Sequence, residues 1–411
     1  MLRSLQCAAG ILIAAGIVLA QDNIQQGKIK KIDADKGIVT LTVNGKDVEV
    51  TATERTRFMV EGREIKDGLK NPAFKEGAEV MFRAIMQDGK LVLQGMRLGG
   101  QSRPGGSSGQ PATGGKPSVG FKPLTEMSAS DKYKGEDGGL YGNGKNEPPP
   151  AHQAAANKEM AKIVPLDSDG KPSSNGKIVL ISISMSNATQ EFSRFKQIAD
   201  ADPAKSKQLV IVDCAQGGQA MAQWAPPNAK AWTVAEERLQ AAGVSNKQVQ
   251  VCWIKLANPG PRGEFQEHAK KLEADTLAVV QNAKARFPNL RIAFLSSRIY
   301  GGYAATQLNP EPYAYEGAFA VRWLIQDQIK GSSDLNHDAS RGSVKAPLLL
   351  WGPYFWADGM TPRKSDGLIW ERTDLGGDGT HPTEAGRKKV AELLLQFFKT
   401  DTTAKPWFVG K

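Results

Sequence analysis

From residue 177 onward the sequence alternates between apolar, strand-like runs and helical patterns, and this alternation restricts the fold most. The continuous apolar runs cover residues 177–183, 208–213, 249–255, 291–296 and 346–351. Helical patterns occupy residues 233–242, 263–287, 315–330 and 383–399. Runs without polar alternation are typical of strands covered on both faces. We therefore expect a parallel sheet between helices, with any ligand at the carboxyl ends of its strands.

Polar residues follow several of these strands and thus fall at that edge of the sheet. Ser184-Met185-Ser186-Asn187 follows the first strand, and Gly217 and Gly218 come shortly after the second. Asn258 follows the third, and Gly377-Asp378-Gly379-Thr380-His381 precedes the last helix. A serine becomes a useful nucleophile at neutral pH when a general base lies beside it. Ser186, His381 and Asp378 are therefore candidates for nucleophile, base and orienting carboxylate. Taken alone, Ser186 would be read as a helix N-cap.

This order and spacing resemble the SGNH (GDSL-like) hydrolase superfamily over roughly residues 177–399. More narrowly, the chain resembles an uncharacterised exported group that carries Tyr-Lys-Gly-Glu-Asp-Gly-Gly-Leu-Tyr, here at 133–141. The resemblance implies a flavodoxin-like three-layer α/β/α fold, with Ser186 as nucleophile and the Asp-x-x-His pair Asp378 and His381 completing the catalytic set. The glycine and aspartate of the family's Gly-Asp-Ser-Leu motif are missing here.

The resemblance also implies an oxyanion hole formed by the N–H groups of Ser186 and Gly218 and by an asparagine side chain, for which Asn258 is the candidate. The family's Gly-x-Asn-Asp sequence is absent. Gly218 would equally serve a tight turn, and Asn258 would equally begin the turn before Pro259. Lys255 is an alternative charged donor.

Further residues at the same edge are candidates for substrate binding: Asn187, Gly217, Lys255, Arg298 and Tyr300. Arg298 would suit a carboxylate or sulfate, and a tyrosine such as Tyr300 would suit the face of a sugar. Structural packing explains both residues equally well.

The other histidines have no mechanism attached to them. His268 falls on a charged helix face expected to be solvated, His337 in a polar loop, and His152 after a proline run, where we expect a surface position. Cys214 and Cys252 are expected in buried strands as free thiols rather than as a disulfide. No Cys and His have the spacing of a zinc site, and no metal or other cofactor is implied.

The N-terminal part of the chain predicts export and a second domain. Residues 1–20 have the positive start and short apolar core of a secretory signal peptide, and no later segment is long and apolar enough to span a membrane. Residues 22–99 predict a small all-β, OB-like barrel. Residues 100–120 are rich in Gly, Ser and Pro and predict a flexible linker. The α/β domain then covers residues 121–402, with a loop-rich lead-in over 121–176.

Two functions remain open at this stage. The first is an exported serine esterase or deacylase that acts on acyl groups of carbohydrate or similar small molecules. The second is a non-catalytic carbohydrate- or ligand-binding protein on the same scaffold, which the divergent motifs favour. Metal-dependent phosphatase or sulfatase chemistry is poorly supported. The net charge of +10 is not concentrated into basic blocks interleaved with aromatic residues, so we expect no nucleic-acid partner.

Overall fold

The chain divides into two compact units, Met1–Gly109 and Gln110–Lys411. The computed structural model describes residues 25–43, 45–60, 63–87, 90–98, 115–260 and 262–410. The predicted signal peptide and most of the predicted linker lie outside the described residues.

The first unit is a small β-barrel. Its strands are β1 (Gln25–Asp33), β2 (Ile38–Val43), β3 (Lys46–Val60), β4 (Arg63–Ile65), β5 (Glu79–Gln87) and β6 (Lys90–Leu98). They are ordered β2-β1-β5-β6-β3-β4, and pairing of β2 with β3 closes the barrel. All pairs are antiparallel except β3 with β6. The predicted all-β barrel is confirmed.

The barrel core follows from alternation along each strand. In β2 every second residue is buried, and Val39 and Leu41 are fully inside. Val50 of β3 and Phe82 of β5 meet them in the same core. Successive side chains of a strand point to opposite faces, so this alternation leaves one face for the barrel interior and one for solvent.

The second unit contains a five-stranded sheet, and all its pairs are parallel. Its strands are β7 (Ile178–Ile183), β8 (Leu209–Val212), β9 (Val249–Lys255), β10 (Ile292–Ser296) and β11 (Leu348–Trp351). The order is β11-β10-β9-β7-β8. Counted along the chain from β7, this is the 2-1-3-4-5 order of flavodoxin-like sheets, whose ligand crevice opens where the strand order reverses. The crevice is therefore expected beyond the carboxyl ends of β7 and β9.

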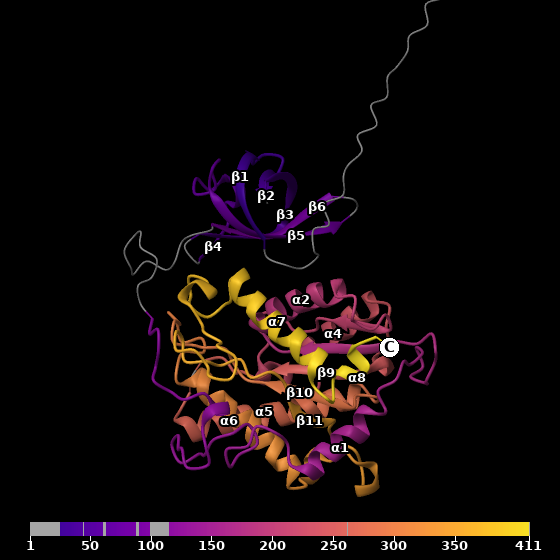
Figure 1. Ribbon diagram of the computed structural model, residues 1–411. Coiled ribbons are helices and arrows are strands. Elements are labelled where there is room, and N and C mark those ends of the chain that lie inside the picture. The colour runs from indigo at the N-terminus through magenta and orange to yellow at the C-terminus, as the bar shows by residue number, and fades with distance from the viewer. Residues whose placement is uncertain are drawn as a thin grey trace, which may run out of the picture. The chain divides into compact units, whose positions relative to one another are not determined.

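Helices cover both faces of this sheet. They are α1 (Pro150–Met160), α2 (Ser186–Ala201), α3 (Met221–Trp224), α4 (Lys230–Ala241), α5 (Phe265–Arg286), α6 (Tyr313–Ile329), α7 (Glu384–Thr400) and α8 (Lys405–Phe408). Helix α2 packs on α7 on one side of the sheet, and α5 packs on α6 on the other (Figure 1). Short 3₁₀ helices in both units are η1 (Gly68–Lys70), η2 (Leu124–Glu126), η3 (Asn246–Gln248), η4 (Ser333–Leu335), η5 (Ala339–Arg341) and η6 (Arg372–Asp374). The predicted three-layer α/β fold is confirmed.

The described end of the predicted linker is held against the α/β unit. The Asp358 carboxylate accepts hydrogen bonds from the main-chain N–H groups of Val119 and Gly120, at 2.7 and 3.0 Å. The N–H of Lys116 donates to the carbonyl of Gly302 at 2.9 Å. Residues 115–120 therefore belong structurally to the α/β unit.

The lead-in segment is also built into this unit. Glu136 and Asp137, within the 133–141 segment, both form ion pairs with the buried Arg322 of α6. The indole N–H of Trp351, at the end of β11, donates to the carbonyl of Leu140 at 2.7 Å. The 133–141 sequence thus fastens the lead-in to one edge of the domain.

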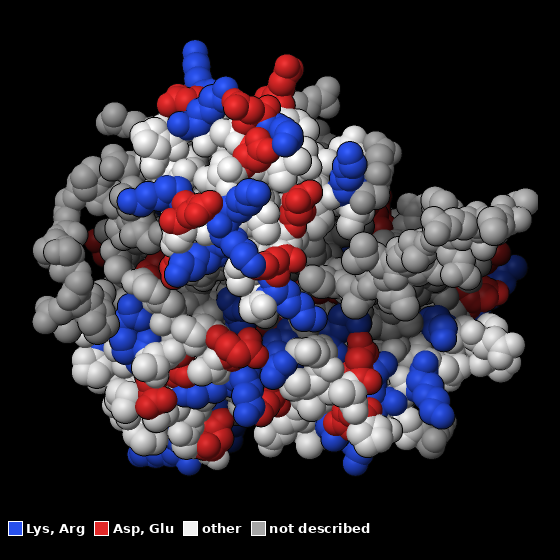
Figure 2. Space-filling view, turned by 90° about the horizontal axis from the view of Figure 1, so that it is seen from above, with Lys and Arg blue, Asp and Glu red and all other residues white. Residues whose placement is uncertain are grey.

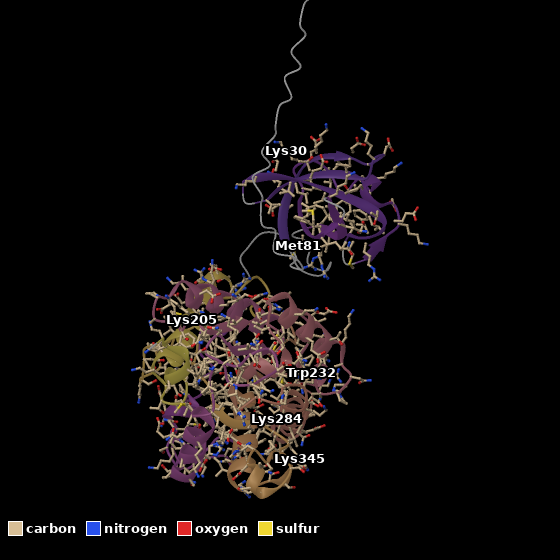
Figure 3. All side chains as sticks on the ribbon, turned by 90° about the vertical axis from the view of Figure 1, so that its right-hand side faces the viewer. Lys30, Met81, Lys205, Trp232, Lys284 and Lys345 are labelled. Atoms are coloured by element: carbon tan, nitrogen blue, oxygen red, sulfur yellow. The ribbon has the colours of Figure 1, made fainter. Side chains whose placement is uncertain are left out.

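Side chains of the α/β unit lie both in its interior and at its surface. Trp232 lies inside the α/β unit, whereas Lys345 lies at its surface (Figure 3). Lysine and arginine are interspersed with aspartate and glutamate over the face drawn in Figure 2, which offers no extended basic field. Within the described residues, no helix is both long enough and apolar enough to cross a bilayer.

Candidate functional site

The candidate nucleophile Ser186 begins helix α2, three residues after β7 ends. Its position follows from the topology, because β7 lies beside the point where the strand order reverses. The Oγ atom of Ser186 lies 2.8 Å from Nε2 of His381, although the two residues are 195 positions apart in sequence. The side chain is half-buried, so the hydroxyl remains within reach of a ligand.

His381 is oriented by Asp378 from the same loop. Its Nδ1 lies 2.5 Å from Oδ2 of Asp378, while Oδ1 accepts the N–H groups of Thr380 and His381, each at 3.0 Å. Burial acts to raise the pKa of Asp378, but these hydrogen bonds outweigh it and hold the pKa below its ordinary value. The ionised carboxylate accepts a hydrogen bond from the N–H at Nδ1, so the proton of the neutral ring lies on Nδ1 and Nε2 is left to accept from the Ser186 hydroxyl.

Contacts with the segment after β10 fix the shape of this loop. Gly379 has φ +65°, and a Cβ there would lie 1.7 Å from the carbonyl oxygen of Tyr303, so only glycine fits. The N–H of Ala305 donates to the carbonyl of Asp378, and the hydroxyl of Thr380 donates to that of Leu308, both at 2.9 Å. The loop is thus held in place by contacts with residues outside the candidate triad.

Asn187 is placed differently from the expected substrate contact. It is 2% exposed, and its Nδ2 donates to the carbonyl of Thr380 at 2.8 Å. This hydrogen bond joins the start of α2 to the loop that carries Asp378 and His381. Asn187 therefore has the geometry of a positioning residue.

Two of the main-chain N–H groups expected to form an oxyanion hole are those of Ser186 and Gly218. Within the described part of the chain, neither Ser186 N–H nor Gly218 N–H has a hydrogen-bond acceptor. Gly218 has φ +76°, and the space around both it and Gly217 is open. Gly218 is exposed and has a backbone conformation that favours glycine, so both of its expected roles remain compatible.

The side chain of Asn258 is engaged in structural hydrogen bonds. Its Oδ1 accepts the N–H of Ala222 at 2.8 Å, and its Nδ2 donates to Asp275 at 2.7 Å. These bonds join the end of β9 to α3 and α5. A role of Asn258 as oxyanion donor remains a prediction, and it would depend on the second N–H of the amide.

Lys255 forms a buried ion pair with Glu191 of α2. Its Nζ lies 2.6 and 2.7 Å from the two carboxylate oxygens, and both side chains are inaccessible to solvent. Burial lowers the pKa of Lys255 to about 8, against the opposing attraction of Glu191. Its ammonium group thus connects the end of β9 to α2.

Tyr300 and Arg298 follow β10 and are both buried. The hydroxyl of Tyr300 donates to the carbonyl of Lys116 at 2.5 Å, so it holds the segment that precedes the lead-in. Arg298 is 3% exposed and has no hydrogen bond or ion pair with any described residue. Of the predicted substrate-binding residues, Arg298 alone is buried with no such partner.

A carboxylate that the sequence analysis did not single out holds α2, the helix that begins with Ser186. Asp213, next after β8, accepts hydrogen bonds from the hydroxyls of Ser182, Thr189 and Ser193, at 2.5, 2.6 and 2.6 Å. Burial raises the pKa of this carboxyl. An aspartate at the carboxyl end of an apolar strand was the available signal. The network links β7, β8 and α2.

The expected surroundings of two histidines were wrong. His152 is 6% exposed and its Nε2 lies 2.8 Å from the carbonyl oxygen of Leu349. His268 is equally buried, with Nε2 2.5 Å from a carboxylate oxygen of Glu316. Both histidines are buried and contact other residues of the same domain.

The cysteines are buried free thiols, as predicted, and burial raises the pKa of both Cys214 and Cys252.

No group of three or more His, Cys, Asp or Glu in the described ranges has an arrangement that could hold a metal ion.

No protein-family model and no curated protein matches the sequence. Among solved structures, the α/β unit is similar to a provisionally named acylhydrolase from Bacteroides fragilis, at 15% identity and TM-score 0.32 over 61% of this chain and 96% of that chain. It is also similar to the salicylyl-acyltransferase SsfX3 of a tetracycline biosynthetic pathway, at 14% identity and TM-score 0.31 over 57% and 58%. The barrel is similar to residues 10–88 of Escherichia coli CusF with Ag(I), at 20% identity and TM-score 0.15 over 20% and 98%. At these identities and TM-scores, the likenesses say nothing about what this chain binds or does.

Proposed function

We propose that this chain is an exported serine hydrolase of the SGNH type that cleaves ester-linked acyl groups from a carbohydrate or similar small molecule. The single observation that carries the proposal is the continuous contact from hydroxyl to imidazole to carboxylate. Ser186 Oγ lies 2.8 Å from His381 Nε2, and His381 Nδ1 lies 2.5 Å from Asp378 Oδ2. This is the arrangement by which a neutral hydroxyl becomes a nucleophile.

In the first half of the reaction, the Ser186 hydroxyl attacks the ester carbonyl carbon while His381 takes its proton. Asp378 stabilises the imidazolium that forms. The N–H groups of Ser186 and Gly218 donate to the oxyanion of the tetrahedral intermediate. Collapse of the intermediate transfers the proton from His381 to the leaving alcohol and leaves the acyl group on Ser186.

In the second half, a water molecule attacks the acyl-serine. His381 accepts one proton from the water and returns it to Ser186 Oγ as the acid leaves. No redox or metal step is needed, because only a proton moves between His381 and the oxygen atoms. Export stays a prediction from the sequence.

The proposal is tested with a fluorophosphonate probe and with p-nitrophenyl acetate and butyrate. We expect the wild type to be labelled and to release p-nitrophenol. Ser186→Ala should lose the label and at least about 10³-fold of the turnover, as expected when the nucleophile of such a set is removed. Ser333→Ala is the control, because Ser333 is exposed and has no hydrogen bond within the described residues.

The engagement of Asn258 by Ala222 and Asp275 favours the second candidate function, a ligand-binding protein without activity. A wild-type protein that is folded, unlabelled and inactive on both esters would overturn the hydrolase proposal and leave the binding protein.

A further inference from the structure

Arg298 is deeply buried and has no hydrogen-bond or ion-pair partner among the residues that the structure describes. It lies two residues after β10, at the carboxyl edge of the sheet, and 3% of the residue is exposed. No acceptor in the described residues receives any of its N–H groups, and its Nε is inaccessible to solvent. A guanidinium has five donors arranged in a planar fork. All five are available here.

Three carboxylates interact electrostatically with Arg298 without touching it: Glu191, Glu311 and Asp378. Each is occupied elsewhere. Glu191 pairs with Lys255 and Asp378 with His381. Glu311 accepts N–H groups of Gly301, Tyr315 and Trp356. These carboxylates offset part of the charge of Arg298 but leave its hydrogen-bonding capacity unused, and the interaction with Asp378 places Arg298 within electrostatic range of the candidate catalytic loop.

Burial of the Arg298 charge is unfavourable in the folded chain. Burial lowers the pKa of Arg298 despite the three nearby carboxylates, so transfer from water is the larger effect. A guanidinium nevertheless stays charged in proteins. A buried charge without hydrogen bonds is unfavourable and is typical of a site completed by a ligand or by trapped water.

Other unpartnered polar atoms lie on the same segment after β10. Within the described chain, Ser297 Oγ and Asn309 Oδ1 are buried without a hydrogen-bond partner. Asn309 Nδ2 and the Tyr313 hydroxyl both lie 3.4 Å from the carbonyl oxygen of Asn258. Arg298 interacts electrostatically with Tyr313. Arg298 thus lies in polar surroundings at the end of the sheet where the ligand crevice is expected.

We propose that Arg298 binds a carboxylate of the substrate, so that the substrate is an ester that also carries a carboxylate close to the reacting bond. This inference rests on the proposed esterase function. Two N–H groups of the fork match the two oxygens of a carboxylate. The nearby Glu191, Glu311 and Asp378 disfavour a doubly charged phosphate. The carboxylate belongs either to the acyl group, as in a half-ester of a dicarboxylic acid, or to the alcohol, as in an acylated uronic acid.

Two substrate pairs distinguish these sources. On the acyl side, p-nitrophenyl hemisuccinate is compared with p-nitrophenyl butyrate. On the alcohol side, acetate release from O-acetyl galacturonate is compared with release from O-acetyl galactose. For Arg298→Met we expect kcat/KM for the charged member of one pair to fall roughly 10- to 150-fold, the range for a charge-assisted hydrogen bond. The neutral member should change less than about threefold. Equal losses on both members, or no loss on either, would overturn the inference.

A binding measurement separates this inference from the proposed function. Succinate and galacturonate are titrated calorimetrically into wild type and Arg298→Met, which requires no turnover. We expect one of them to bind the wild type and not the variant, even if Ser186 proves unreactive. Binding of neither ligand, or equal binding to both proteins, would overturn the inference.

Stability provides a matched control with a second buried arginine. Arg322 is 2% exposed but pairs with Glu136 and Asp137. Arg322→Met should lower the urea midpoint, because it breaks these pairs. Arg298→Met should leave the midpoint unchanged or raise it, because it removes a charge held at net cost. A drop in the Arg298→Met midpoint as large as that of Arg322→Met would indicate a structural arginine and overturn the inference.

Discussion

The side-chain amide of Asn187 donates to the main-chain carbonyl of Thr380 at 2.8 Å, across 193 positions of sequence. Asn187 follows Ser186 directly, and Thr380 lies between Asp378 and His381. One hydrogen bond therefore joins the segment that carries the candidate nucleophile to the segment that carries its base. We expect this connection to help fix the distance between Ser186 Oγ and His381 Nε2.

Asn187→Ala should therefore lower kcat on p-nitrophenyl butyrate by about 10- to 100-fold, because small displacements of reacting groups have effects of this size. KM should change little. The free energy of unfolding should fall by about 1–2 kcal/mol for the lost hydrogen bond. Asn282→Ala is the matched control, since Asn282 Nδ2 donates to the carbonyl of Ala225 at the same 2.8 Å, in a hydrogen bond that involves neither Ser186 nor the loop of Asp378 and His381. Equal effects of the two variants on kcat would contradict a positioning role.

Asp378→Asn should keep the fold and lose most of the activity. An amide nitrogen facing His381 Nδ1 favours the tautomer with its proton on Nε2, and this tautomer cannot accept from Ser186. We expect kcat to fall on the order of 10²- to 10⁴-fold. Stopped-flow release of p-nitrophenol measures the effect. Asp202→Asn, which weakens a hydrogen bond with Lys399 at the far end of α2, should retain activity.

The sheet could be predicted because its strands are buried on both faces. Residues 249–255 coincide with β9, and the predicted strand 291–296 begins one residue before β10. Continuous apolar runs indicate where buried strands lie but not their exact limits, since the predicted strand 346–351 begins two residues before β11. No single run indicates the strand order, and a flavodoxin-like fold was expected only from the family resemblance.

The candidate triad could be predicted because its three residues occur in two short motifs at strand and helix ends. The partners of other polar residues could not. Glu191 lies 64 positions from Lys255, and Glu316 lies 48 from His268. Hydrophobic patterning indicates whether a position faces the core, but it does not identify the charged residue that a buried side chain contacts. Lys255 and His268 were therefore assigned to ligand or solvent rather than to a buried partner.

The Lys255–Glu191 ion pair should show strong coupling in a double-mutant cycle. Lys255→Met alone leaves Glu191 buried and unpaired, and Glu191→Leu alone does the same to Lys255. Each single change should cost about 3–5 kcal/mol, whereas the double variant should recover most of that loss. Urea unfolding measures all four proteins. Additive losses would show that the two groups act independently.

Glu311 should make stability depend on pH between about 5 and 7. Burial raises its pKa from 4.5 to about 7, against the opposing hydrogen bonds from Trp356, Gly301 and Tyr315. The folded chain then binds more protons than the unfolded chain in this range, so stability falls as pH rises through it. Relative to Glu311→Gln, the wild type should lose up to about 3 kcal/mol between pH 4.5 and pH 8. A difference that stays flat with pH would contradict this expectation.

Gly218→Ala tests whether the N–H of residue 218 donates to the oxyanion. Gly243→Ala is the control, because an alanine there is expected to have similar backbone strain. The two glycines have φ +76° and +70°, and a Cβ at either would meet open space. An alanine in this conformation costs about 1–2 kcal/mol, so both variants should lose similar stability in urea unfolding. Relief of that strain would turn the N–H of residue 218 away from the developing oxyanion. Loss of one such donor reduces kcat by roughly 10²- to 10³-fold, so Gly218→Ala should approach this loss while Gly243→Ala keeps wild-type turnover. If both variants keep full turnover, the oxyanion is stabilised elsewhere, and the second N–H of Asn258 becomes the next donor to remove.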